Sequence, residues 1–350
     1  GIVTRHAVSY LTSVFGYNTW GAYTAAGFLN RFLVNGEGMA LWTAIFILIS
    51  TAVLTVGARE NVEKFCRVGM PALLTVFIAL TVYTALQPGA YDGFRFMFSW
   101  NIEPLRENFL GVLSSAAGQL LLSLSLGLGI LITYGSFLEK KEKLQRSSAV
   151  IVICDTAVAV LSGVLVIPAC FAFMDGDISF DPCLLFNSVQ EIFLRMDYFG
   201  TVMGFVFYAL VLSAALSSTV SVMDVIASAM ADMDIAKNRA PRRRKAILVC
   251  CALTLALSLP AAFEGIGTAG GKSAGLLGIY DTLSTGVLMP LVTGVMSVAL
   301  GWLWKPGLAE DECELSGTGF RGRALFSLCC RVVVPLLMLL TVAGQALKIS

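Results

Sequence analysis

Hydroxyl side chains are concentrated in one otherwise apolar stretch, AALSSTVSVMD (residues 214–224). Four of them lie within five positions: Ser217, Ser218, Thr219 and Ser221. Hydroxyl and carbonyl oxygens are hard ligands, the type that a small hard cation prefers. In a helix the same hydroxyls can instead donate to backbone carbonyls of the preceding turn. The residues alone therefore leave two interpretations open: a cation site, or side chains that bond their own helix.

A carboxylate lies within another apolar run, Asp155 in VICDTAVAVLSG (residues 152–163). A charged side chain inside a membrane is costly unless it is paired, so such residues are candidates for functional sites. The alternative is that Asp155 lies close enough to the membrane surface to be solvated.

Glycine and serine are unusually dense in a third apolar run, GVLSSAAGQLLLSLSLGLGILITYGSFL (residues 111–138). The closely spaced members are Gly118, Ser123, Ser125, Gly127 and Gly129. Glycine inside a helix costs about 1 kcal/mol relative to alanine, so the helix could unwind here and present free carbonyls. Unwound backbone at membrane depth is tolerated only where it lines a cavity or is buried in protein. Close helix packing through small residues is the alternative.

Motifs of soluble enzymes occur without the context that they need. Residues 265–270 match a dinucleotide-binding glycine pattern, but they follow an apolar helix rather than a strand. Residues 271–275 match a nucleophile elbow, which requires a histidine partner; the only histidine, His6, is predicted on the other side of the membrane. An intramembrane hydrolase would need paired aspartates, a Ser–His pair or a His-rich motif within the spans. The sequence offers none of these, and we do not expect an enzyme.

The elements that position these residues follow from composition. The 350 residues are 57% hydrophobic and 13% charged, with a mean hydropathy of +0.81. A soluble domain is nearer half apolar and about a quarter charged, so this chain has too little charge to cover a water-facing surface. The net charge of +1 implies no polyanionic partner such as nucleic acid. The nine cysteines lie mostly in apolar runs and fit neither a disulfide framework nor a zinc site.

Apolar runs of about 20 residues are long enough to cross a bilayer as helices. Nine segments qualify: 8–33, 40–58, 68–87, 110–138, 147–174, 199–231, 246–263, 276–304 and 324–347. The chain is therefore predicted to be an all-α, polytopic transmembrane helix bundle that forms a single transmembrane domain over residues 1–350.

The distribution of Lys and Arg predicts the orientation. With the N-terminus inside, the loops 1–7, 59–67, 139–146, 232–245 and 305–323 carry 17 Lys and Arg, against 5 in the outer loops. Positive charge concentrates on the cytoplasmic side of membrane proteins, so the N-terminus of this chain is predicted to be cytoplasmic. The basic run at residues 242–245 is explained by its position in a cytoplasmic loop beside a span, without a separate role in binding nucleic acid or lipid.

Several of these runs resemble one family. GQLLLSLSLGLGILITYGSFLEK (118–140) resembles the sixth helix of the neurotransmitter:sodium symporters, and DTAVAVLSGVLVIPACFAF (155–173) their seventh. AALSSTVSVMD (214–224) is similar to the eighth helix, DPCLLFNSVQEIFLRM (181–196) to the outer loop before it, and YDTLSTGVLMPLVTGVMSVALGW (280–302) to the tenth helix of the bacterial branch. The resemblance covers most of residues 38–347 and is strongest over 118–224.

The resemblance implies an inverted-repeat transporter that binds substrate and sodium midway across the membrane, beside broken helices. It assigns the first sodium ion to Ser123 and Asp155, where Asp155 replaces the usual asparagine. It assigns the second sodium ion to the carbonyl of Ala214 and to Ser217 and Ser218.

The substrate pocket implied by the resemblance has six members: Tyr23, Leu122, Ser125, Leu128, Ser218 and Val222. Leu122 and Leu128 replace frequent aromatic residues. Gln119 matches a chloride-site position, but Ala159 stands where its serine partner would be, so chloride is not expected to be required.

The first two helices of the family have no counterpart here, so the chain is expected to be N-terminally incomplete and to hold the third to eleventh helices. The function implied is sodium-coupled uptake of an amino acid or small amine across the bacterial inner membrane, by a protein that could form a homodimer. The alternative is a non-transporting scaffold, a receptor-like membrane protein or an inactive fragment.

Overall fold

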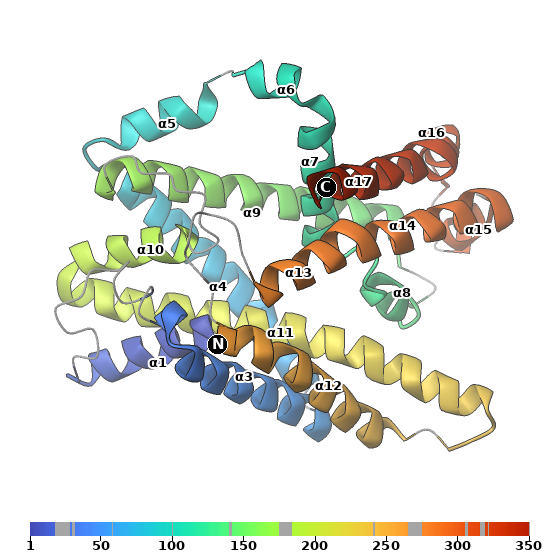
Figure 1. Cartoon of the computed structure of the whole chain (residues 1–350), viewed down its shortest axis with the longest axis horizontal. Helices are drawn as coiled ribbons and strands as arrows, with labels where there is room; N and C mark the ends of the chain where they lie inside the picture. Colours follow the sequence, from blue (N-terminus) through green and yellow to red (C-terminus); the bar gives the residue numbers. More distant parts are fainter. Residues whose placement is uncertain are drawn as a thin grey trace. The chain divides into compact units, whose positions relative to one another are not determined.

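The computed structural model describes residues 1–17, 29, 32–57, 59–99, 101–139, 142–174, 184–240, 242–264, 275–304, 307–315, 319–320 and 322–349. These residues form helices and the turns between them, with no strand in the described ranges. Figure 1 shows the helices along the chain. The all-α prediction is confirmed.

Among the residues that the structure describes, seven helical segments are long and apolar enough to span a membrane: 36–56, 64–85, 144–173, 199–236, 243–264, 276–303 and 323–345. Each corresponds to one of the nine predicted spans. The chain is therefore a multi-pass membrane protein.

The other two predicted spans are not single helices. Residues 110–138 are divided into α7 (Phe109–Ser123) and α8 (Ile130–Gly135). The prediction of one helix over 8–33 is wrong at its start, because α1 covers Ile2–Val14 and is followed by a turn in which Gly16 has a φ of 86°. Left-handed backbone of this kind ends a helix. Residues 18–28, 30 and 31 lie outside the described residues.

The chain divides into two compact units. The first comprises residues 1–99 and 158–278, and the second comprises residues 100–157 and 279–350. The boundary at residue 157 falls within helix α9 (Leu144–Phe173).

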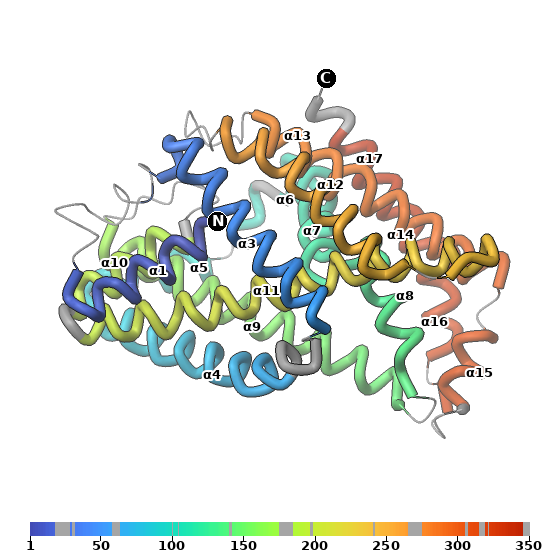
Figure 2. The backbone as a smooth tube through the Cα atoms, turned by 90° about the horizontal axis from the view of Figure 1, so that it is seen from below, coloured from blue at the N-terminus to red at the C-terminus, as the bar shows by residue number. Residues whose placement is uncertain are grey.

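The first unit is built around α11 (Asp197–Ala236), which packs against α1, α4 (Arg59–Ala85), α10 (Leu184–Arg195) and α12 (Arg243–Glu264). Helix α3 (Gly36–Val56) lies along α12, as both ribbon views show (Figures 1 and 2). The short α5 (Ala90–Phe98) follows α4. Capping fixes the ends of α3: the Asn35 side chain accepts a hydrogen bond from the Gly38 N–H at 3.0 Å, and Gly57 ends the helix at a φ of 73°.

The second unit contains α7, α8, the first half of α9, and a pair formed by α14 (Met289–Val298) and α17 (Val334–Ile349). Helices α13 (Leu276–Leu283), α15 (Gly307–Leu315) and α16 (Arg323–Leu328) connect to this pair, and α6 (Glu103–Glu107) precedes α7. Three π-helical turns, at Ser284–Leu288, Ala299–Leu303 and Cys329–Val333, interrupt the helices of the pair. Such turns widen the backbone and occur frequently at functional sites.

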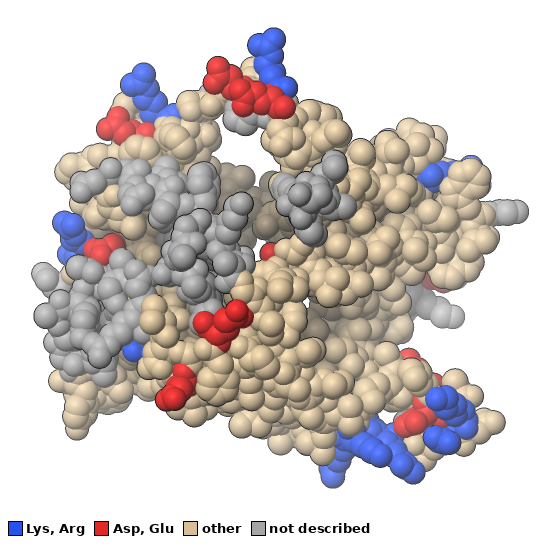
Figure 3. Space-filling model, viewed as in Figure 1, with Lys and Arg blue, Asp and Glu red and all other residues tan. Residues whose placement is uncertain are grey.

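Charged side chains are sparse on the face seen in Figure 3, where basic residues gather at the junction of α11 and α12. This junction contains the run at residues 242–245, in the loop with the most positive charge of the sequence. Its composition agrees with a water-facing end of two spans.

Candidate functional site

Helix α7 ends at Ser123 and α8 begins at Ile130, so the Gly- and Ser-rich run is unwound between them. Three residues of the break have positive φ: Ser125 (54°), Gly127 (82°) and Gly129 (76°). The last carbonyls of a helix and the first N–H groups of the next lack helical partners. The break therefore presents polar backbone within an apolar segment, and the unwinding interpretation is confirmed.

Gly127 also serves close packing. A Cβ atom at this position would lie 2.7 Å from the Met289 carbonyl oxygen and 2.9 Å from the Thr293 hydroxyl oxygen, both on α14. By contrast, a Cβ atom at Gly118 would meet nothing within 4 Å. Packing thus explains Gly127 but not Gly118.

The break is linked to α9 through a hydrogen bond between two of the predicted sodium ligands. The Ser123 hydroxyl donates to Asp155 Oδ1 at 2.5 Å. Ser123 is exposed at the end of α7, and Asp155 is half-buried on α9. A hydroxyl and a carboxylate thus meet beside the freed carbonyls of the break, and all of these are hard oxygen donors suited to an alkali cation.

The hydroxyl-rich stretch of α11 mainly bonds its own helix. Ser217, Thr219 and Ser221 donate to the carbonyls of Ala214, Ala215 and Ser217 at 2.8, 2.9 and 2.9 Å. The Ser217 bond also places its oxygen beside the Ala214 carbonyl oxygen, so the two predicted ligands adjoin on one face. Ser218 is exposed on the same helix.

The residues predicted for the substrate fall in both units. Leu122, Ser125 and Leu128 lie at the end of α7 and in the break, where the two leucines are 49% and 36% exposed. Ser218 and Val222 lie one turn apart on α11 in the first unit. Tyr23 lies outside the described residues.

The two residues considered for chloride lie on different helices. Gln119 is exposed on α7, and Ala159 is exposed on α9. An alanine side chain offers no hydrogen-bond donor to an anion.

Sequence analysis missed an ion pair between α11 and the start of α12. Asp224 is 1% exposed, and its carboxylate accepts a hydrogen bond from the Arg243 guanidinium at 2.6 Å. A buried carboxylate requires such a partner. A carboxylate near the end of an apolar run, followed by a basic run, was the signal that could have found it.

The single histidine lies in a packed aromatic cluster of the first unit. The rings of His6 and Tyr10 stack on Tyr208 with centroid distances of 5.0 and 5.3 Å. The His6 Nδ1 atom lies 2.8 Å from the Ile2 carbonyl oxygen. These contacts join α1 to α11.

Comparison with known proteins places this architecture in a family. The model of the sodium:neurotransmitter symporter family matches residues 31–350. The chain is 27% identical over 285 residues to an uncharacterized sodium-dependent transporter of Haemophilus influenzae, covering 80% of this chain and 59% of that protein. It is 28% identical over 306 residues to an uncharacterized sodium-dependent transporter of Bacillus subtilis, covering 85% and 64%. The chain thus spans about three fifths of the length of these relatives.

A solved structure shares the fold. The crystal structure of MhsT in complex with L-phenylalanine superposes with a TM-score of 0.84 at 27% identity, covering 98% of this chain and 76% of that one. The likeness extends over nearly all of the chain, and the family model matches more than half of it. The chain belongs to the sodium:neurotransmitter symporter family.

Proposed function

We propose that the protein carrying this chain is a sodium-coupled symporter that takes up an amino acid or related small amine by alternating access. The Ser123–Asp155 hydrogen bond beside the helix break carries this proposal. Broken helices hold substrate and coupling ions in inverted-repeat transporters, because only unwound backbone offers free carbonyls and N–H groups within the membrane.

The first sodium ion would bind Ser123 and Asp155, together with carbonyls of the break. The carboxylate is tied to the end of α7 by the Ser123 hydroxyl. Sodium binding there would replace this hydroxyl donor with a cation and hold α7 and α9 together.

The second sodium ion would bind Ser217, Ser218 and the Ala214 carbonyl. The adjoining oxygens of Ala214 and Ser217 support this assignment. A cation held there would draw α11 towards a partner segment and act as a conformational clamp as well as an energy source.

The substrate is proposed to be a neutral amino acid with a medium-sized apolar side chain. Leu122 and Leu128 would provide aliphatic walls beside Ser125. Ser218, Val222 and Tyr23 are proposed as further substrate-binding residues on the family resemblance alone. The related MhsT structure contains L-phenylalanine, and leucines in place of aromatic residues leave room for an apolar side chain.

Chloride independence is part of the proposal. Two sodium ions beside a neutral binding site leave positive charge uncompensated, and Asp155 supplies a fixed negative charge near the first ion. We place the protein in the bacterial inner membrane with the N-terminus of this chain cytoplasmic. Its partners are the bilayer, the small-molecule substrate and a second copy in a homodimer.

Uptake by the full-length protein in proteoliposomes tests the proposal. A panel of labelled amino acids is offered with and without an inward sodium gradient, using wild type, Leu122→Phe and the control Leu120→Phe. We expect sodium-dependent uptake of medium apolar amino acids, which Leu122→Phe shifts towards smaller ones and Leu120→Phe leaves unchanged. Sodium-independent uptake would overturn the function, whereas sodium-dependent preference for glycine or charged amino acids would overturn only the substrate class.

A further inference from the structure

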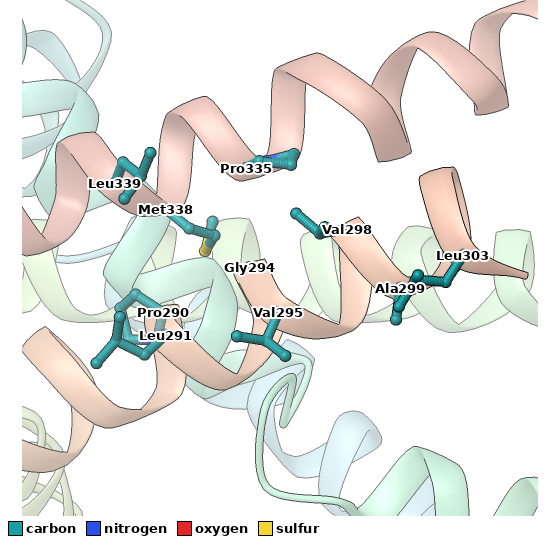
Figure 4. Close-up of a pocket in the computed structure, with 10 residues that line it drawn as sticks. All are labelled: Pro290, Leu291, Gly294, Val295, Val298, Ala299, Leu303, Pro335, Met338 and Leu339. Carbon is teal, nitrogen blue, oxygen red and sulfur yellow. The ribbon is translucent and has the colours of Figure 1, made fainter.

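An apolar crevice opens between α14 and α17, within the second unit. Its volume is about 320 Å³, at the lower end of the ~300–1,000 Å³ typical of ligand pockets. Figure 4 shows Val298 of α14 directed towards Pro335 of α17, and Met338 of α17 directed towards α14 near Gly294. The lining is apolar along its whole length.

The two helices approach each other closely at two points. Within the lining of the crevice, a Cβ atom at Gly294 would lie 3.4 Å from Met338 Cβ. Beyond its end, a Cβ atom at Gly301 would lie 2.9 Å from Arg331 Cγ. Between these two points, Val298 and Pro335 border the open space.

Arg331 does not line the crevice but lies beyond its end, beside Gly301. Pro335 has no N–H group, so the Arg331 carbonyl four residues earlier lacks its helical donor. The Trp302 indole N–H donates to this carbonyl at 3.3 Å. The Arg331 Nε–H in turn donates to the Gly301 carbonyl at 2.9 Å. These two bonds fix the arginine at the junction of the helices.

The remaining N–H groups of Arg331 make no hydrogen bond or ion pair within the described parts of the chain, and the residue is exposed. Arg331 lies one turn before Pro335, on the helix face that continues to Met338 and Leu339. A guanidinium with free N–H groups binds an anionic phosphate in a bidentate manner.

Arg331 lies within the span 323–345 and contacts a residue at the end of the neighbouring span. Its partner Trp302 is 65% exposed and stands next to the end of the span at Leu303. Exposed tryptophans concentrate at the headgroup level of membranes. From Leu303 to Leu291 the crevice extends about 18 Å along α14, which accommodates a chain crossing one leaflet of a core about 30 Å thick.

We propose that this crevice binds one phospholipid with an anionic headgroup, its phosphate on Arg331 and Trp302 and one acyl chain between α14 and α17. The occupant has an apolar chain because the lining is apolar within two membrane spans. It has an anionic headgroup because Arg331, beyond the end of the crevice, is a cation whose remaining N–H groups have no partner among the described residues. The bound lipid would fill the space beside Pro335 and the π-helical turns at Ala299–Leu303 and Cys329–Val333.

Native mass spectrometry of the full-length protein tests this inference. The protein is equilibrated with equimolar phosphatidylglycerol and phosphatidylcholine of identical chains, and the bound lipid of each class is counted. Arg331→Gln removes the cation, and Val298→Phe fills the crevice. The matched controls are Arg323→Gln, which removes a cation paired with Glu310, and Val292→Phe, on α14 outside the crevice.

We expect wild type and both controls to retain one phosphatidylglycerol in preference to phosphatidylcholine. Arg331→Gln should reduce this preference about tenfold, the scale of a lost charge-assisted bidentate contact, and Val298→Phe should remove binding of both lipids. Equal retention of the two lipids by wild type would overturn the inference. So would unchanged binding in Val298→Phe, or a change in oligomeric state without loss of lipid, which would identify the face as a contact between copies of the chain. If Arg331→Gln fails to fold, Arg331→Lys, which keeps the charge without the bidentate geometry, should show an intermediate preference.

Discussion

Asp155 carries the charge that would balance the proposed sodium ions. It is hydrogen-bonded to Ser123 in a segment where most side chains are apolar. A fixed carboxylate has the role that a bound anion would otherwise have, and Ala159 offers no donor to such an anion.

Uptake is therefore expected to persist when chloride is replaced by gluconate. In Asp155→Asn the fixed charge is lost, and uptake should become dependent on chloride or fall many-fold. The measurement is sodium-driven uptake in proteoliposomes in the two salts.

Ser123→Ala serves as the control, because it removes an oxygen ligand and keeps the carboxylate. It should weaken sodium dependence without creating chloride dependence. A many-fold loss of wild-type uptake in gluconate would contradict the assignment.

Residue types alone singled out the hydroxyl-rich stretch and Asp155, and the family resemblance then assigned the individual sodium ligands. Ala214 and Ser217 are three residues apart and share a face of any helix. The hydrogen bond from the Ser217 hydroxyl to the Ala214 carbonyl could not be predicted, because a serine hydroxyl in a helix can donate to any of several backbone carbonyls or to solvent. The pairing of Asp224 with Arg243 joins residues 19 positions apart on two helices. Helical spacing does not predict it, and the carboxylate followed by a basic run was its only signal in the sequence.

At the scale of elements, the break between α7 and α8 is the feature on which the site depends. Gly127 has a φ of 82° and lies against the backbone of α14. Two structural requirements therefore call for glycine at this position: the backbone is left-handed, and α14 approaches too closely to leave room for a Cβ atom.

Gly127→Ala should therefore impair both the break and its packing. Left-handed backbone costs a residue with a Cβ about 1–2 kcal/mol, and the contact with the Met289 carbonyl adds to this. We expect a lower thermal midpoint in detergent and a severe loss of sodium-dependent uptake.

Gly135→Ala is the matched control, since a Cβ atom there would meet nothing within 4 Å. It should leave both readouts unchanged. Equal behaviour of the two variants would show that the conformation at Gly127 is dispensable.

The contact between α1 and α11 gives a second test at this scale. A Cβ atom at Gly204 would collide with the ring of Tyr10, which also stacks on Tyr208. Gly204→Ala should lower the thermal midpoint by forcing these aromatic rings apart, with an expected loss of about 1–3 kcal/mol for overpacking. Gly118→Ala, whose new methyl group meets no neighbour, should be neutral or slightly stabilising. A neutral Gly204→Ala would mean that the aromatic cluster is loosely packed.

Hydrophobic length predicted seven of the helices closely, because a bilayer fixes how long an apolar helix must be. Hydrophobic length could not decide whether the glycines near residue 127 unwind the helix or let it pack closely against a neighbouring helix, since both outcomes use small residues. It also failed at the start of the first predicted span, where Gly16 ends α1 early. The π-helical turn before Pro335 leaves no periodic signal in the sequence, because it inserts one residue without changing composition.

At the scale of the whole molecule, the charge distribution predicts orientation. The loop between α11 and α12 is basic, and the loop that contains Ser99 lies on the predicted outer side.

Cysteine labelling in intact cells tests this orientation. In a background whose exposed cysteines are replaced by serine, Ser99→Cys should react with a membrane-impermeant maleimide. Asn238→Cys should react only after the membrane is opened. Both positions are exposed in the fold, so the reverse pattern would invert the topology.

The central claim is that sodium binding on α11 drives transport, and it is tested most directly by the sodium dependence of uptake in Ser217→Ala and Ser218→Ala. Each substitution deletes an oxygen ligand without adding bulk. Thr219→Ala is the control, because it removes a hydroxyl that bonds the Ala215 carbonyl outside the proposed site.

Uptake against sodium concentration is measured for the full-length protein in proteoliposomes. We expect the sodium half-saturation to rise about tenfold in each serine variant, the scale of a lost polar contact to a charge, with membrane insertion unchanged and Thr219→Ala behaving as wild type. An unchanged half-saturation in both serine variants would show that these hydroxyls only bond their own helix, and would contradict the account.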